Sequence, residues 1–213
     1  MTQDVWDARA DLYRESEAHR EGPDLDLLVA WAADARTALD VATGGGHVAR
    51  RLREAGLKVV TTDRSPGMQP DVISPAEHLP FANASFDVVA TRVAAHHFDD
   101  VEAAVREMAR VARDRVLVVD NLFMGDDAER AERLRDPSHV RNYAEDDWRR
   151  FLEGAGLEVE EVERFEKPIE LEPWFERAAT PEADARRVRE LLADRIQDGW
   201  VRLDRIALKA VKR

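Results

Sequence analysis

The sequence predicts an α/β fold in which helices cover a mostly parallel sheet. Short apolar segments end in a carboxylate near the start of the chain, beginning with Ala38-Leu39-Asp40-Val41. A segment with apolar residues at helical spacing, Val48, Leu52 and Ala55, follows the first of them. Between the two lies Thr43-Gly44-Gly45-Gly46, which must be a turn because glycine is costly inside a strand or helix. In such a sheet this turn marks a ligand-binding edge.

Composition restricts the function classes. The chain has 213 residues, a net charge of −12 and no cysteine. The acidic balance argues against a general affinity for nucleic acid or anionic membranes. Disulfides and thiolate metal sites are excluded, and we expect no metal site. The polar start of the chain is unlike a signal peptide and no apolar run could span a membrane, so we expect one cytoplasmic domain over residues 1–213.

Two helices are expected before the first strand. Residues 3–20 read as a polar helix with Trp6 and Tyr13 on roughly one face. After the break at Gly22-Pro23, a second helix over Leu25 to Ala33 places Leu28 and Trp31 on one side.

The second strand, Leu57 to Thr62, ends at Asp63. A βαβ unit places an acidic residue about there, where its carboxylate accepts from ribose hydroxyls. Both nicotinamide dinucleotides and S-adenosylmethionine (SAM) carry such a ribose. Asp40 distinguishes them, because a carboxylate beside the turn favours the cationic SAM and repels a pyrophosphate.

The connection to the third strand is short. Only Arg64 to Pro70 separates Asp63 from Asp71-Val72-Ile73, whereas parallel strands need a crossover of roughly a dozen residues. The third strand is therefore expected to be short or lost from the parallel set, and one face of that sheet edge to lack its usual cover.

The remaining segments continue the alternation of strands and helices. Further strands are expected over 87–92, 116–120, 157–165 and 205–211, and helices over 101–111 and 148–155. Residues 166–200, with three prolines and a helix beginning near Thr180-Pro181, form a helical insertion before the last strand.

Two motifs carry a resemblance to a known family. Asp40-x-Ala42-x-Gly44-x-Gly46 resembles the first motif of class I SAM-dependent methyltransferases, with Ala42 in place of a glycine. Ala76-Glu77-His78-Leu79-Pro80-Phe81, followed by Ser85-Phe86-Asp87, resembles the ubiquinone/menaquinone-biosynthesis (type 11-like) members. The resemblance implies a Rossmann-like sheet with an antiparallel last strand and a small helical cap.

The same resemblance implies the site. Residues 1–35 would form a helical lid over the cofactor, with Tyr13 and His19 as candidate lid residues. The residues expected to bind SAM are Asp40, Ala42, Thr43, Gly44, Gly46, Asp63, Arg64, Ala76, Glu77, Arg92 and Tyr13. Pro75 replaces the usual acidic adenine ligand, and Glu77 or backbone groups are expected to take over that contact.

His96 and His97 are the catalytic candidates. The family commonly has a His-His pair here, and an imidazole can take a proton from a hydroxyl or carbon acid because its pKa lies near neutrality. The alternative is that the histidines only shape the pocket; as a base, His96 is preferred over His97. His139, Arg141 and Tyr143 resemble a stretch that borders the acceptor pocket, where they would bind a polar or anionic acceptor.

The function expected is SAM-dependent methyl transfer to a small-molecule acceptor by in-line displacement. The alternative is a SAM-binding protein of the same fold that transfers no methyl group, a cyclase or cofactor sensor; a nicotinamide dehydrogenase is a more distant third. Neither nucleic acid nor a membrane is expected as a partner, and the chain is expected to be a monomer or a homodimer.

Overall fold

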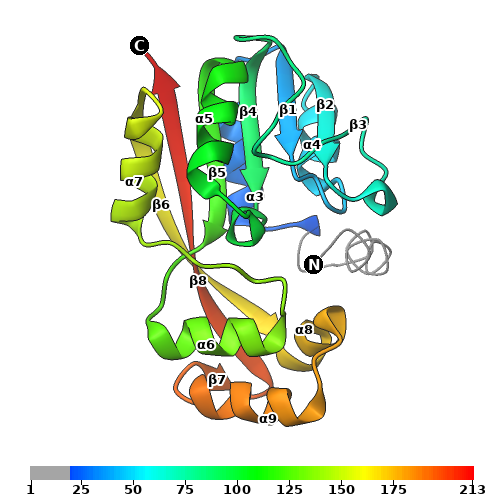
Figure 1. Ribbon diagram of the computed structural model, residues 1–213, viewed down its shortest axis with the longest axis vertical. Helices are drawn as coiled ribbons and strands as arrows, with labels where there is room; N and C mark the ends of the chain where they lie inside the picture. The colour runs from blue at the N-terminus through cyan, green and yellow to red at the C-terminus, as the bar shows by residue number, and fades with distance from the viewer. Residues whose placement is uncertain (1–19) are drawn as a thin grey trace.

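The computed structural model describes residues 20–213, and its central feature is one sheet running the length of the molecule (Figure 1). Tyr13, Trp6 and His19 lie outside the described residues. The strands are β1 (Thr37–Val41), β2 (Lys58–Asp63), β3 (Val72–Ile73), β4 (Phe86–Arg92), β5 (Ala112–Asn121), β6 (Leu157–Glu170), β7 (Ile196–Gln197) and β8 (Trp200–Lys212). Their order is β3-β2-β1-β4-β5-β8-β6, with β7 paired to β8.

The strand directions confirm the predicted fold class. β1, β2, β3, β4 and β5 pair in parallel, and β8 runs antiparallel to both β5 and β6. The helical elements are α3 (Pro23–Trp31), α4 (His47–Glu54), η1 (Pro66–Met68), η2 (Ala95–His97), α5 (Val101–Val111), α6 (Asp126–Arg135), α7 (Glu145–Gly154), α8 (Leu171–Ala178) and α9 (Glu182–Leu191).

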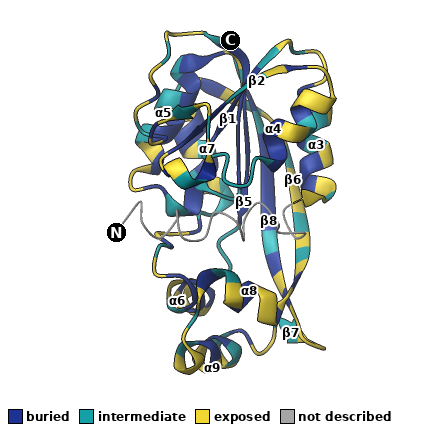
Figure 2. Cartoon of the chain, turned by 90° about the vertical axis from the view of Figure 1, so that its right-hand side faces the viewer, coloured by how far each residue is buried: buried dark blue, intermediate teal, exposed yellow. Residues whose placement is uncertain are grey.

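Both faces of the parallel strands are buried, which explains their continuous apolar runs. Leu39 and Val89 point to the face covered by α5 and α7, where they join one apolar cluster. Ala38 and Val88, one residue away, point to the face covered by α3 and α4 and join a second cluster. Figure 2 shows these strands buried between helices whose outer surfaces are exposed.

A helical cap extends the molecule beyond the parallel strands (Figure 1). α6, α8 and α9 pack around a third apolar cluster with the lower ends of β6 and β8. The expected bounds of the insertion were wrong here: residues 166–170 extend β6, and β8 begins at Trp200 instead of Arg205. Pro168 lies inside β6 and pairs in register with Arg202, because an edge strand tolerates a residue without an N–H.

The short connection after β2 holds one turn of 3₁₀ helix, η1. β3 is only two residues long and pairs in parallel with β2 through Thr62–Val72 and Asp63–Ile73. The prediction of a short third strand is therefore confirmed. Met68 of η1 is buried, whereas Ile73 at the sheet edge is 59% exposed, as expected for an edge without its usual covering helix.

Candidate functional site

The glycine turn connects β1 to α4 at the carboxyl edge of the sheet. Ala42, Gly44 and Gly46 all have left-handed φ values, 54°, 51° and 75°. Gly46 is the N-terminal cap of α4, and its N–H donates to the carbonyl of Thr43 at 2.9 Å. The tight turn therefore brings the first backbone N–H groups of α4 to the sheet edge, where they can face a ligand.

Asp40 stabilises this turn through hydrogen bonds. Its buried Oδ2 accepts from the hydroxyl of Thr43 at 2.5 Å and from the N–H of Ala49 at 3.1 Å. Burial raises the pKa of Asp40 to about 6, although these hydrogen bonds oppose the shift. The carboxylate is thus both a structural support of the turn and a charge whose ionisation a nearby cation would favour.

Asp63, at the end of β2, faces the same turn. One of its oxygens accepts from the N–H of Gly44 at 2.9 Å and the other accepts from the N–H of Ser65 at 2.9 Å. Burial raises the pKa of this carboxyl, and the two backbone donors oppose that effect. Each carboxylate oxygen has a second lone pair, so the group can still accept from a ligand hydroxyl.

One cavity opens over this turn. Nine of the expected cofactor residues line it, together with His97: Asp40, Ala42, Thr43, Gly44, Asp63, Arg64, Ala76, Glu77 and Arg92. Gly46, His96, His139, Arg141 and Tyr143 are not among its lining residues. Within residues 20–213, no group of three or more His, Cys, Asp or Glu side chains is arranged to hold a metal ion.

Sequence reasoning missed several lining residues. They are Gly45, His47, Val48, Met68, Ser74, Val93, Ala94 and Phe98. Val93 and Ala94 directly follow β4, so their position after a parallel strand was a usable signal. Met68 and Phe98 had no such signal, because each is brought in by a 3₁₀ turn that the sequence pattern does not reveal.

Glu77 lines the cavity and also supports α5. Its Oε1 accepts from the N–H of Asp99 at 3.0 Å and from that of Asp100 at 3.3 Å. The carboxylate is therefore tied to the segment that starts α5, whose first turn is capped by Asp100.

Arg92 belongs to a buried charge cluster behind the cavity. Its Nε donates to Oδ2 of Asp24 at 2.8 Å, and Nη1 of Arg205 donates to the same oxygen at 3.1 Å. Burial opposes ionisation of Asp24, but the two arginines outweigh it and hold its pKa below the usual range. Burial likewise lowers the pKa of Arg205 to about 10. The cluster fixes α3 to β4 and β8.

The two histidines of η2 have different surroundings. His96 is buried. Its ring Nδ1 lies 2.5 Å from Oδ1 of Asp120, and its backbone N–H donates to Oδ2 of Asp120 at 2.8 Å. Burial opposes protonation of His96, but the charge of Asp120 raises its pKa. His97 lines the cavity, and its Nδ1 lies 3.0 Å from the carbonyl oxygen of Ser138. Burial and the charge of His96 hold the pKa of His97 well below its usual value.

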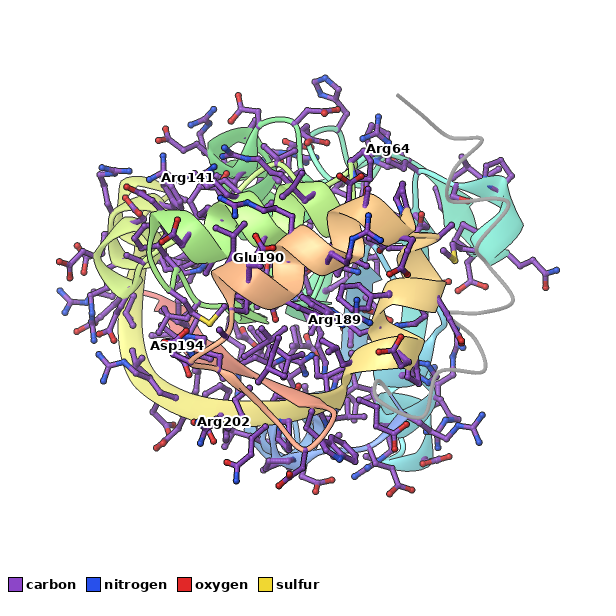
Figure 3. All side chains as sticks on the ribbon, turned by 90° about the horizontal axis from the view of Figure 1, so that it is seen from below. Arg64, Arg141, Arg189, Glu190, Asp194 and Arg202 are labelled. Carbon is purple, nitrogen blue, oxygen red and sulfur yellow. The ribbon has the colours of Figure 1, made fainter. Side chains whose placement is uncertain are left out.

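The three candidate acceptor residues separate in space. His139 is buried, with its ring 5.6 Å from that of His96 and its Nε2 3.2 Å from Oε2 of Glu129. Tyr143 packs edge-on against Trp148 of α7. Arg141 is exposed and lies toward the outside in the view from the cap end (Figure 3).

The fold and the site define a Rossmann-like methyltransferase domain, and comparison with known proteins agrees. Residues 39–119 match the methyltransferase domain family. The chain is 33% identical over 197 residues to the uncharacterized methyltransferase YcgJ of Bacillus subtilis (strain 168), covering 81% of this chain and 78% of that protein. The chain therefore belongs to the methyltransferase domain family.

Solved structures show the same similarity. The crystal structure of YcgJ has a TM-score of 0.79 at 28% identity and covers 89% of this chain and 98% of that one. A structure from Bacillus halodurans C-125, of a protein proposed to be a methyltransferase, has a TM-score of 0.77 at 30% identity and covers 90% and 99%. More distantly, 1,6-didemethyltoxoflavin-N1-methyltransferase of Burkholderia thailandensis, solved with S-adenosylhomocysteine, shares the fold with a TM-score of 0.60 at 18% identity over 95% and 81%.

None of the helices in residues 20–213 has the length and apolar character needed to cross a bilayer.

Proposed function

We propose that this protein transfers the methyl group of SAM to a small-molecule acceptor by in-line displacement. The observation that carries the proposal is one cavity lined by both Asp63 and His97. Asp63 is a hydroxyl-accepting carboxylate beside the glycine turn, and His97 is an imidazole whose pKa is low enough for it to be neutral near pH 7. A cofactor-binding group and a proton-accepting group therefore share a single cavity.

The residues present fit SAM. The left-handed turn at Gly44 lines the cavity, Asp63 retains lone pairs for the ribose hydroxyls, and Met68 and Phe98 add apolar surface. Asp40 places a buried carboxylate beneath the turn, which suits a ligand with a cationic amino group and sulfonium. The Burkholderia thailandensis fold relative, which holds S-adenosylhomocysteine, supports the same assignment.

SAM supplies, when bound, a methyl group already activated on a sulfonium, so the protein mainly has to position the acceptor in a site shielded from water. Where the acceptor is a hydroxyl or a carbon acid, we assign its proton to His97. The hydroxyl or carbon would lose its proton to the imidazole and gain the methyl group as the methyl–sulfur bond breaks, which would leave S-adenosylhomocysteine. The imidazole would keep the proton until solvent removes it. An acceptor that is already a neutral nucleophile needs no such base.

We further propose that the acceptor approaches from the side of the cap. His139 lies next to the histidine pair and offers Nδ1, a buried atom that has no hydrogen-bond partner among the described residues. A polar acceptor group is the natural partner for such an atom. Arg141 and Tyr143, the other two candidates, lie farther along the same segment, where they can contact a larger acceptor.

The proposed role of residues 1–35 is that of a lid. α3, within this range, supports it: Asp24 of α3 pairs with Arg92, and Arg92 lines the cavity. α3 would therefore anchor the proposed lid beside the cofactor site.

The experiment that tests the proposal has two stages. Calorimetric titration should give binding of S-adenosylhomocysteine and none of NAD. Incubation with SAM and a panel of hydroxyl, amine and carbon-acid metabolites, followed by mass spectrometry, should then give a product heavier by one methyl group. The fold relative SpnF, a cyclase with a TM-score of 0.65 at 16% identity, shows why the second stage is needed. Binding of S-adenosylhomocysteine with isomerised but unmethylated product would replace methyl transfer by the alternative function.

A further inference from the structure

The arrangement of donors and acceptors around His96 and His97 determines where their protons lie. On the Nδ1 of His96, the only polar contact among the described residues is the carboxylate of Asp120 at 2.5 Å. The same carboxylate accepts from the backbone N–H groups of His96 and Asn121, both at 2.8 Å. An ionised carboxylate can only accept, so Nδ1 of His96 must carry a proton.

His97 is held by a different element, the loop between α6 and α7. Its Nδ1 lies 3.0 Å from the carbonyl oxygen of Ser138 and 3.3 Å from the Ser138 hydroxyl oxygen. The carbonyl can only accept. The hydroxyl has a single proton, and it donates that proton to Oδ1 of Asp136 at 2.6 Å, so it presents only lone pairs to the imidazole. Both contacts therefore require the proton of neutral His97 to be on Nδ1.

Asp136 is itself fixed in place. Its Oδ1 also accepts from the N–H of Ser138 at 3.0 Å, and the side chain of Arg135 approaches its Oδ2 at 3.9 Å. The loop is further tied to η2, because the N–H groups of Val140 and Arg141 both donate to the carbonyl of His96, at 2.8 and 3.2 Å. The loop of the cap and the histidine pair are thus one hydrogen-bonded unit.

We propose that Asp120 and the Asp136–Ser138 unit are positioning residues that impose one proton arrangement on the pair. Both rings carry a proton on Nδ1; a further proton on the pair lies on His96, and His97 is the neutral member, with no proton on Nε2. The inference rests on the proposed function, because it explains how the cavity-lining His97 can serve as its base.

Electrostatics supports this division. The ring centroids are only 4.1 Å apart, so two charged rings would repel each other. When one ring of the pair is charged, the other is therefore held neutral. Asp120 stabilises the charge on His96, and His96 in turn disfavours a charge on His97. The other charged or titratable groups facing the pair are Glu132 and Arg135 of α6 and Asp136 and His139 of the loop. On the side of the cavity they are Asp40, His47, Asp63, Arg64, Glu77 and Arg92.

The arrangement can be read directly by NMR of the whole protein with ¹⁵N-labelled histidine, because protonated and bare imidazole nitrogens have different shifts. The chain has six histidines, and single His→Gln variants assign them. In the wild type we expect His97 to be neutral with its proton on Nδ1 at pH 7. We expect His96 to titrate above the ordinary midpoint of about 6.5.

Two variants then test the positioning residues. Asp120→Asn should lower the titration midpoint of His96 by about one pH unit or more, because the carboxylate that stabilises its charge is lost. The midpoint of His97 should rise, because a neutral His96 no longer disfavours its protonation. Asp136→Ala frees the Ser138 hydroxyl to donate, so a mixture of His97 tautomers should appear. Asp127→Ala, an exposed aspartate of α6, is the matched control and should change neither ring.

The overturning results are specific. A proton on Nε2 of neutral His97 in the wild type refutes the inference. This measurement needs no variant, so the inference stays testable even if a variant fails to fold. An unchanged His96 midpoint in folded Asp120→Asn refutes the role of Asp120. Because these measurements need neither cofactor nor acceptor, they are separate from the calorimetry of S-adenosylhomocysteine, whose failure would refute the proposed function instead.

Discussion

The carboxylate of Asp63 accepts a hydrogen bond from the backbone N–H of Gly44 at 2.9 Å. This contact joins the end of β2 to the turn after β1. The two strands are adjacent and parallel. A group expected only to bind a ribose therefore also shapes the surface on which the cofactor would lie. Loss of the side chain should affect both the direct contacts and the turn.

Asp63→Ala should weaken binding of S-adenosylhomocysteine. Hydrogen bonds to a charged group contribute on the order of 1.5–3 kcal/mol, so a loss of about ten- to a hundredfold in affinity is expected by calorimetry. Asp26→Ala is the control, since Asp26 is exposed and pairs with Arg51 at the surface. Equal affinity in Asp63→Ala and the control would remove Asp63 from the cofactor site.

Asp40→Asn should change both the pH dependence of the unfolding free energy and the affinity for SAM. The pKa of Asp40 is about 6 in the folded protein against 3.8 for a free side chain, so the folded state holds its proton more tightly. This stabilising effect is complete at low pH and is lost as the pH rises through about 6. Relative to the variant, the wild type should lose on the order of 2–3 kcal/mol of unfolding free energy between pH 4 and 7.5.

Chemical denaturation of the wild type and Asp40→Asn across that pH range measures the difference in unfolding free energy. The variant serves as the reference because the other carboxylates are present in both proteins. The variant should also bind SAM less tightly at pH 7.5, because the cationic ligand loses a nearby carboxylate. A constant stability difference between pH 4 and 7.5 would contradict the assigned pKa.

Asp24→Ala should destabilise the fold strongly. It leaves Arg92 and Arg205 buried without their shared carboxylate, and breaking a buried ion pair in this way costs about 3–5 kcal/mol. Because the pKa of Asp24 is lowered, its contribution in the wild type is present at neutral pH and disappears as the pH falls through the folded pKa. Asp26→Ala in the same helix should shift the urea midpoint little. Similar midpoints for the two variants would disprove the buried cluster.

Ala42→Gly should stabilise the protein. Ala42 has a φ of 54°, and a left-handed conformation costs an ordinary residue about 1–2 kcal/mol, against roughly 0.5–1 kcal/mol for the extra flexibility of glycine. A gain of up to about 1 kcal/mol is expected in thermal or chemical unfolding. Ala30→Gly, at an exposed position in α3, should have the opposite sign because its conformation is helical. A loss of stability in Ala42→Gly would show that its methyl group is needed in the cavity wall.

His97→Ala should bind S-adenosylhomocysteine nearly normally but turn over slowly, with a loss of about 10²–10⁴ where the acceptor must lose a proton. His96→Ala should also lower turnover, since it removes the charge beside His97. Product formation on the acceptor found by mass spectrometry measures both. A loss of only a few-fold in His97→Ala would restrict this residue to shaping the pocket.

Local sequence patterns were enough to predict much of the fold and the edge of the sheet that carries the cavity. Continuous apolar runs in β1 and β4, helical spacing in α4 and α5, and the glycine turn are consequences of residues close in sequence. The same holds for the position of Asp63, because parallel strands bring their carboxyl ends to one edge. The short β3 likewise follows from chain length alone, since the connection after Asp63 cannot contain a packed helix.

The sequence by itself thus determined the fold class, the edge of the sheet on which the cavity lies and the family resemblance, all of which depend on local periodicity and short motifs. Only the tertiary structure decided which histidine reaches the cavity. His96 and His97 are neighbours with the same chemistry, and what distinguishes them comes from distant segments: Asp120 at the end of β5 and Ser138 in the cap loop. The same is true of Asp24, whose partners Arg92 and Arg205 lie on other strands. Contacts between residues far apart in sequence leave no periodic signal, so burial and pairing had to be read from the folded chain.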